Sequence, residues 1–138
     1  MMRKKGLLHH IELNVADLHI SLHFWGWLLS KLGYSVYQSW EKGQSWKLDE
    51  TYIVFVQTRE KHLPFGYHRS RTGLNHLAFH LDTKEEVDDF TSVLKERGIT
   101  ILYKDNHPYA GGLSHYAVYF EDPNRIKVEL VATETEQK

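Results

Sequence analysis

The chain has 138 residues, of which 41% are hydrophobic and 25% are charged, and its formal net charge at neutral pH is −1. This length predicts one ordinary globular domain, and the balanced charge excludes a broad electrostatic surface for nucleic acid or anionic lipid. Cysteine is absent, which excludes disulfide frameworks, thiolate zinc sites, iron–sulfur clusters and cysteine nucleophiles. The 10 histidines favour metal or proton chemistry, because histidine is the commonest metal ligand.

No segment predicts membrane insertion or secretion. The longest apolar run, residues 52–56, is too short to cross a bilayer. The basic start of the chain continues into polar residues, where a signal peptide needs an apolar stretch. We therefore expect a cytoplasmic protein that binds neither membrane nor nucleic acid.

The first half of the chain reads as a strand, a helix and three further strands. Alternating residues predict a strand over 9–15, and an apolar stripe at helical spacing predicts a helix from Leu18 to Leu32. Asp17 is a suitable N-cap and Gly33 a suitable residue after the C-cap. The three strands that follow are expected at residues 34–40, 45–49 and 52–57.

The second half repeats this pattern. HIELNVAD begins at His10, and the similar HLAFHLDT begins at His76. A helix is predicted from Lys84 to Arg97, where Thr83 and Glu86 have the spacing of a capping box. The flanking strands are expected at residues 75–81, 100–104, 115–121 and 126–131.

Such a repeat predicts two copies of one supersecondary unit. Module one spans about residues 7–58, a loop covers 59–74, module two spans about 75–131, and 132–138 form a frayed tail. The predicted fold class is α+β, with two βαβββ modules forming a curved eight-stranded sheet or half-barrel that carries its helices outside.

Strand alternation brings a set of polar side chains to the face turned away from the helices. His10 and Glu12 lie opposite the apolar residues of the first strand, and His76 and His80 do so in its repeat. Glu129 points away from the apolar face of the last strand. Two imidazoles and a carboxylate suit a divalent first-row metal with open positions for substrate. The alternative is that these are separate polar residues on a solvated face.

At these residues the chain resembles the vicinal oxygen chelate superfamily, which contains glyoxalase I, fosfomycin-resistance proteins, extradiol dioxygenases and bleomycin-resistance proteins. The resemblance covers about residues 7–131 and rests on the motifs LHHIELNVADL, GLNHLAFHLD and YFEDPNRIKVELV. It implies paired βαβββ modules, often in a homodimer whose site lies within or between chains. It also implies His10 (rather than His9), His76 and Glu129 as metal ligands.

Two positions depart from the family pattern. Glyoxalase I has a second carboxylate near the end of the first module, where this chain has Phe55, and Gln57 is the nearest polar residue. Methylglyoxal isomerisation is therefore not expected unless Gln57 is a fourth ligand. Arg125 stands where the aspartate-proline turn usually has glycine.

Other positions resemble the fosfomycin branch, in which a tyrosine ten residues before the metal glutamate contacts the substrate. Tyr119 stands at that spacing. Where that branch has a hydroxyl residue, this chain has Glu12, which is suited to act as a general base. His80 is expected either behind the ligands as a proton shuttle or as an ordinary packed or solvated histidine. Residues 107–112 are expected to form either a mobile lid or a plain connecting loop, and Arg69 and Arg71 either meet an anionic substrate or are solvated.

The expected function is that of a metal-dependent enzyme, a lyase, transferase, isomerase or dioxygenase, acting on a small substrate that chelates the metal through adjacent oxygens. Ni, Mn, Zn and Fe all accept this ligand set. The alternative is a metal-free protein that sequesters its ligand, as bleomycin-resistance proteins do. The expected partners are a small-molecule substrate and a second copy of the chain.

Overall fold

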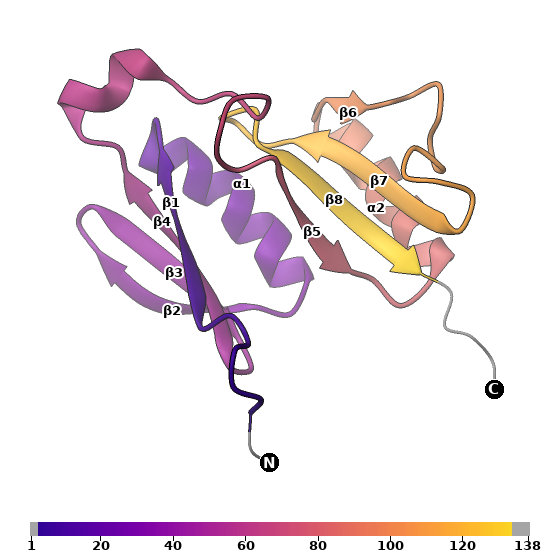
Figure 1. Ribbon diagram of the computed structural model, residues 1–138, viewed down its shortest axis with the longest axis horizontal. Coiled ribbons are helices and arrows are strands. Elements are labelled where there is room, and N and C mark those ends of the chain that lie inside the picture. The colour runs from indigo at the N-terminus through magenta and orange to yellow at the C-terminus, as the bar shows by residue number, and fades with distance from the viewer. Residues whose placement is uncertain (1–2, 134–138) are drawn as a thin grey trace. The chain divides into compact units, whose positions relative to one another are not determined.

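The computed structural model describes residues 3–133. The chain divides between Gly66 and Tyr67 into two compact units, each containing its own sheet and its own helix (Figure 1). Within residues 3–133, neither helix has the length and apolar character needed to span a membrane.

The first unit is a βαβββ module with a short 3₁₀ helix after it. Its sheet has the strand order β1-β4-β3-β2, in which β1 and β4 are parallel and the other neighbours are antiparallel. The elements are β1 (His10–Val15), α1 (Leu18–Lys31), β2 (Ser35–Trp40), β3 (Gly43–Leu48), β4 (Thr51–Gln57) and η1 (Glu60–Phe65).

The second unit repeats this connectivity. Its sheet has the order β5-β8-β7-β6, again with one parallel pair, β5 and β8. The repeated topology confirms the predicted α+β class and the two βαβββ modules. The elements are β5 (His76–His80), α2 (Lys84–Glu96), β6 (Ile101–Leu102), β7 (His115–Glu121) and β8 (Lys127–Thr133).

Both helices begin at the predicted N-caps. The carboxylate of Asp17 accepts a hydrogen bond from the Ile20 amide at 3.2 Å. At α2 the Glu86 amide donates to the Thr83 hydroxyl at 3.1 Å, and the Glu86 carboxylate accepts from the Thr83 amide at 3.1 Å. The capping box predicted from the sequence is confirmed, and it satisfies amides that have no partner within the helix.

We expect Thr83→Ala to lower the free energy of unfolding by about 1 kcal/mol, because it removes the acceptor of the Glu86 amide. Urea denaturation followed by circular dichroism measures the change. Thr83→Ser keeps the hydroxyl and should retain most of the stability. Equal losses in both variants would show that the cap has no role.

The core of the first unit lies between α1 and one face of its sheet. Trp25 is fully buried and stacks on Phe55, with ring centroids 5.1 Å apart. The rings of Trp46 and Phe55 pack edge to face, with centroids 5.9 Å apart. Leu13 is buried whereas Glu12 is exposed, so the alternation predicted for β1 is confirmed.

The core of the second unit follows the same plan under α2. Val87 and Leu94 of the helix are fully buried, as are the apolar residues on the helix-facing side of its sheet: Val118, Phe120, Val128 and Leu130. The other face of this sheet therefore presents the alternate residues of β5, β7 and β8, including Glu129.

The main differences from the sequence prediction concern the loop between the modules, β6 and the tail. The loop at 59–74 contains η1. Strand β6 has only two residues, because Tyr103 adopts a positive φ of 56° that ends the strand. Strand β8 continues through Thr133, which pairs with His115, so this part of the predicted tail is ordered in the sheet. The rest of that tail, 134–138, is outside the described residues.

Candidate functional site

The second unit brings three strands together around Glu129. In the parallel pair, Ala78 of β5 lies opposite Glu129 of β8, and His76 lies one pleat away on the same face. In the antiparallel pair, Tyr119 of β7 is the direct partner of Glu129. The predicted placement of Tyr119 on the side of Glu129 follows from this register.

Glu129 is a buried carboxylate with three polar neighbours. It is 3% exposed. The Nε2 atom of His76 lies 3.1 Å from its Oε1, Nε2 of His115 contacts its Oε2, and Tyr119 makes a hydrogen bond to it. A buried carboxylate needs such partners because desolvation of its charge is costly. Both carboxylate oxygens thus meet nitrogen atoms that can also bind metals.

The second ring nitrogen of His76 is held by its neighbour in the chain. Its Nδ1 lies 2.7 Å from the side-chain oxygen of Asn75. Because that oxygen only accepts, Nδ1 is the donor in this contact, which fixes the direction of the ring toward the Glu129 carboxylate. Metal-ligating histidines are commonly oriented in this way by a carbonyl on the other ring nitrogen.

Tyr119 is a neutral hydrogen-bond donor at this site. The pKa of Tyr119 is raised to about 12. The largest cause is burial of the hydroxyl, followed by the negative charge of Glu129 and the hydrogen bond that Tyr119 makes to it. The Tyr119 ring also lies edge-on to Tyr103, with centroids 5.4 Å apart. The phenol is therefore protonated at neutral pH and fixed in direction.

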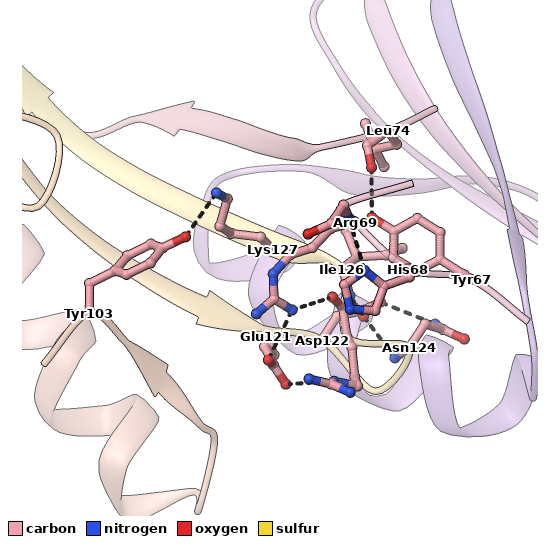
Figure 2. A network of polar contacts seen from close by, with 12 residues as sticks. Tyr67, His68, Arg69, Leu74, Tyr103, Glu121, Asp122, Asn124, Ile126 and Lys127 are labelled. Carbon is pink, nitrogen blue, oxygen red and sulfur yellow. Dashed lines mark hydrogen bonds and ion pairs between the residues drawn. The ribbon is translucent and has the colours of Figure 1, made fainter. Parts of the chain in front are cut away.

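Lys127 adds a positive charge on the same face of β8. Its Nζ lies 3.1 Å from the hydroxyl of Tyr103 (Figure 2) and 5.9 Å from the centre of the Tyr119 ring. This ammonium group is suited to attract an anionic substituent of a substrate.

The turn between β7 and β8 is built on Asp122. Its Oδ1 accepts from the amides of Asn124 and Ile126, each at 2.7 Å (Figure 2). Arg125 has a positive φ of 66°, so the turn keeps a conformation that favours glycine although the residue is arginine. Arg69 pairs with Glu121 at 3.0 Å and donates to the Arg125 carbonyl at 3.0 Å. The structure therefore gives Arg69 a role in supporting this turn, which is neither the substrate contact nor the solvated position that the sequence left open.

We expect Arg125→Gly to raise the free energy of unfolding by about 1 kcal/mol, because glycine adopts the positive φ without steric cost. The lost ion pair with Glu121, at 3.7 Å on an exposed side chain, offsets little of this gain. Thermal unfolding measures the change. Arg125→Ala removes the same charge without relieving the backbone, and it should not stabilise the protein.

In the first unit, His10 and Glu12 lie on the face of β1 turned away from α1. Both are exposed. Nδ1 of His10 lies 2.9 Å from Nδ1 of His9, and its ring stacks on Tyr52 with centroids 4.7 Å apart. These contacts fix the plane of the imidazole, while Glu12 lies on the same face, two residues along the strand.

The sequence places Gln57 behind the metal ligands and leaves open that it is a fourth ligand, and the structure gives its side chain contacts at the start of α1. The register pairs Val15 with Gln57 and Leu13 with Phe55, which places both β4 residues on the helix-facing side. The side-chain oxygen of Gln57 accepts a hydrogen bond from the backbone N–H of Leu18 at 2.9 Å. Its side-chain nitrogen donates to the backbone carbonyl of Ala16 at 2.8 Å. It therefore supports the start of α1, and we leave Gln57 out of the proposed ligand set.

The comparisons with known proteins agree with this architecture. Residues 7–130 match the model of the Glyoxalase/Bleomycin resistance protein/Dioxygenase superfamily. The chain belongs to this superfamily. The resemblance to vicinal oxygen chelate proteins seen in the sequence is thereby confirmed.

Individual relatives of this glyoxalase-like chain include two Bacillus proteins. YqjT of Bacillus subtilis, whose activity is unassigned, is 58% identical over 125 residues, which are 91% of this chain and 98% of YqjT. A candidate glyoxalase from Bacillus halodurans has a solved structure with 59% identity and a TM-score of 0.91, covering 93% of this chain and 96% of that one. The fosfomycin resistance protein FosX from Listeria monocytogenes shares the fold, with 23% identity, a TM-score of 0.70, and coverage of 96% and 95%.

His115 is the site residue that the sequence reading of this glyoxalase-like chain missed. It lies on β7 four residues before Tyr119, so both side chains are on the same face of the strand. This spacing in the sequence could have identified His115 as a neighbour of the site. His80, predicted as a proton shuttle, is exposed on the same face of β5 as His76.

The described residues 3–133 contain no ready-made group of three or more His, Cys, Asp or Glu side chains arranged to hold a metal ion. The two imidazoles near Glu129 contact different oxygens of its carboxylate. The donor atoms themselves fit the divalent metals used in this superfamily, because they combine imidazole nitrogens with a buried carboxylate.

Proposed function

We propose that this chain is a metal-dependent enzyme that binds a small substrate through adjacent oxygen atoms, with the divalent ion held by His10, His76 and Glu129. The observation that carries the proposal is the buried carboxylate of Glu129 with the Nε2 atom of His76 at 3.1 Å, in a chain of the glyoxalase superfamily. Nickel, manganese, zinc and ferrous iron all suit these ligands.

A distant relative supports the chemical class. A variant of FosX from Listeria monocytogenes, 24% identical to this chain, has been solved with Mn(II) and 1S,2S-dihydroxypropylphosphonic acid. That ligand carries hydroxyl groups on adjacent carbons and an anionic group. Tyr119 and Lys127 of this chain are suited to such a molecule, as a neutral donor and a cation on the face that carries Glu129.

When bound, the ion supplies Lewis-acid polarisation of the substrate oxygens. Within the proposal, Tyr119 is a catalytic residue that donates a hydrogen bond to a substrate oxygen, and Lys127 attracts its anionic substituent. Glu12 accepts a proton as general base, a role suited to a carboxylate on the exposed face of β1. His80 relays protons to solvent from the same face of β5 as His76. These roles serve a lyase, a transferase or an isomerase, and ferrous iron would add ring-cleaving oxygenation.

Metal titration tests the proposal. We expect the purified protein to bind Zn²⁺ or Mn²⁺ with a stoichiometry near one per chain, measured by isothermal titration calorimetry. His76→Ala should weaken binding by at least about 100-fold, as expected for loss of a ligand rather than of its supporting shell. His19→Ala, at an exposed position on α1, is the matched control and should bind as the unchanged protein does.

The alternative of a metal-free sequestering protein predicts different results. Such a protein binds no metal specifically, and His76→Ala leaves its affinity for a ligand unchanged. Gel filtration with light scattering tests the expected homodimer.

A further inference from the structure

The second unit has a pocket where α2 ends and β6 begins. Its volume is about 540 Å³, and small-molecule sites have volumes of about 300–1,000 Å³. All of the lining residues belong to the second unit, so one compact unit is enough to form the pocket. Polar and apolar side chains both contribute to the lining, and they are Lys95, Ile99, Thr100, Ile101, Lys104 and His107.

The end of α2 forms one wall of this pocket. Gly98 has a positive φ of 73° and reverses the direction of the chain after the helix. The Gly98 amide donates to the Lys95 carbonyl at 3.0 Å, and the Ile99 amide donates to the Leu94 carbonyl at 3.0 Å. The carbonyl groups at a helix end repel anions, and these hydrogen bonds satisfy two of them. The wall therefore contributes the ammonium group of Lys95 with less opposition from the helix end.

The pocket and the Glu129 site lie on opposite faces of the sheet. Ile101 of β6 lines the pocket and is 5% exposed. The next residue, Leu102, packs against the cluster that contains Tyr119. Successive side chains of a strand point to opposite faces. The pocket is therefore separate from the residues to which we assign metal binding.

The charges around the pocket favour an anion. Lys95, Lys104 and His107 line it, and none of the described residues in the lining carries a carboxylate. Burial lowers the pKa of His107, the positive charge of Lys95 lowers it further, and Asp88 acts in the opposite direction. The Asp88 carboxylate accepts a hydrogen bond from the Tyr116 hydroxyl at 2.7 Å. An anion between the lysine and the imidazole would be attracted by the same positive field.

We propose that this pocket binds a small phosphate monoester, whose phosphate group lies between Lys95 and Lys104 and whose organic part packs on Ile99. A phosphate monoester carries nearly two negative charges at neutral pH, which two ammonium groups can balance. The hydroxyl of Thr100 and the imidazole of His107 supply further hydrogen-bond donors. This site is additional to the proposed metal site and does not depend on it.

A nuclear magnetic resonance titration of the full chain with phenyl phosphate tests the proposal. We expect a saturable shift of the amide signals of residues 98–107, from which the dissociation constant is obtained. Inorganic phosphate should bind about 10-fold more weakly, because it has no apolar part to remove from water. Benzyl alcohol has the apolar part without the charge and should cause no saturable shift of these signals.

Variants of the two lysines identify the phosphate contact. Lys95→Gln and Lys104→Gln should each weaken phenyl phosphate binding by about 10-fold, because each removes a charged hydrogen-bond donor. Lys31→Gln is the matched control, since Lys31 occupies the last turn of α1 as Lys95 occupies the last turn of α2. Its dissociation constant should equal that of the unchanged protein. Melting temperatures measured for every variant verify that each is folded.

Three outcomes would overturn the proposal. The first is the absence of a saturable shift at residues 98–107. The second is unchanged affinity in both Lys95→Gln and Lys104→Gln, or an equal loss in Lys31→Gln, which would indicate only a general effect of net charge. The third is equal affinity for phenyl phosphate and inorganic phosphate, which would exclude an organic ester as the ligand. Zn²⁺ binding by the lysine variants should be unchanged, so the metal proposal is tested separately.

Discussion

Glu129→Gln should abolish tight metal binding, lowering affinity by about 100-fold or more, which corresponds to about 2.7 kcal/mol. Glutamine has nearly the same shape, but it removes the negative charge that lies between the imidazoles of His76 and His115. Removing the charge weakens a site for a divalent cation more than any change on the solvated surface. Calorimetric titration with Zn²⁺ measures the loss.

The control for this variant concerns stability. Glu129 is buried, and its neutral replacement does not leave an unpaired buried charge. The melting temperature in the absence of metal should therefore remain within a few degrees, whereas the stabilisation of the unchanged protein by added Zn²⁺ should disappear in the variant. Retention of that metal-dependent stabilisation in Glu129→Gln would contradict the assignment of Glu129 as a ligand.

Phe55→Ala should lower the free energy of unfolding by about 3–5 kcal/mol, because it leaves a large cavity in the core of the first unit. Phe55 is fully buried, with Trp25 stacked at 5.1 Å and Trp46 against its edge at 5.9 Å. Chemical denaturation followed by tryptophan fluorescence reports the loss directly, since both tryptophans contact the deleted ring.

Two further replacements of Phe55 test the size of its side chain and its buried location. Phe55→Leu keeps most of the volume and should cost less than about 1.5 kcal/mol. Phe55→Glu places a carboxylate in the core beneath α1 and should prevent folding of the unit, so it should not restore the extra carboxylate of glyoxalase I. A folded Phe55→Glu protein with increased metal affinity would contradict the register that pairs Leu13 with Phe55.

Local sequence signals predicted much of the fold. The capping pairs at Asp17 and at Thr83 with Glu86 determine where the helices begin, because their side chains satisfy free amides within one turn. Alternation determined which residues of β1 and β8 face the helices, since side chains of a strand alternate between its two faces. The similar segments at His10 and His76 predicted the duplicated module in the same way.

The family motifs also predicted part of the candidate site. They selected His76, Glu129 and Tyr119, which the second unit brings together. His10 and Glu12 have the predicted exposure on β1. Their participation in the site stays a prediction.

Other features depended on the pairing of strands that are distant in the sequence. Gln57 supports the start of α1 because the parallel register of β1 and β4 places it on the helix-facing side. His115 reaches Glu129 because β7 lies beside β8 and Gly111 lets the preceding loop close against the ring. The sequence by itself determined the helices, the strands and their faces, since these follow from local chain geometry. Only the tertiary structure decided which side chains meet at the buried carboxylate, because that depends on strand register and on the path of a loop.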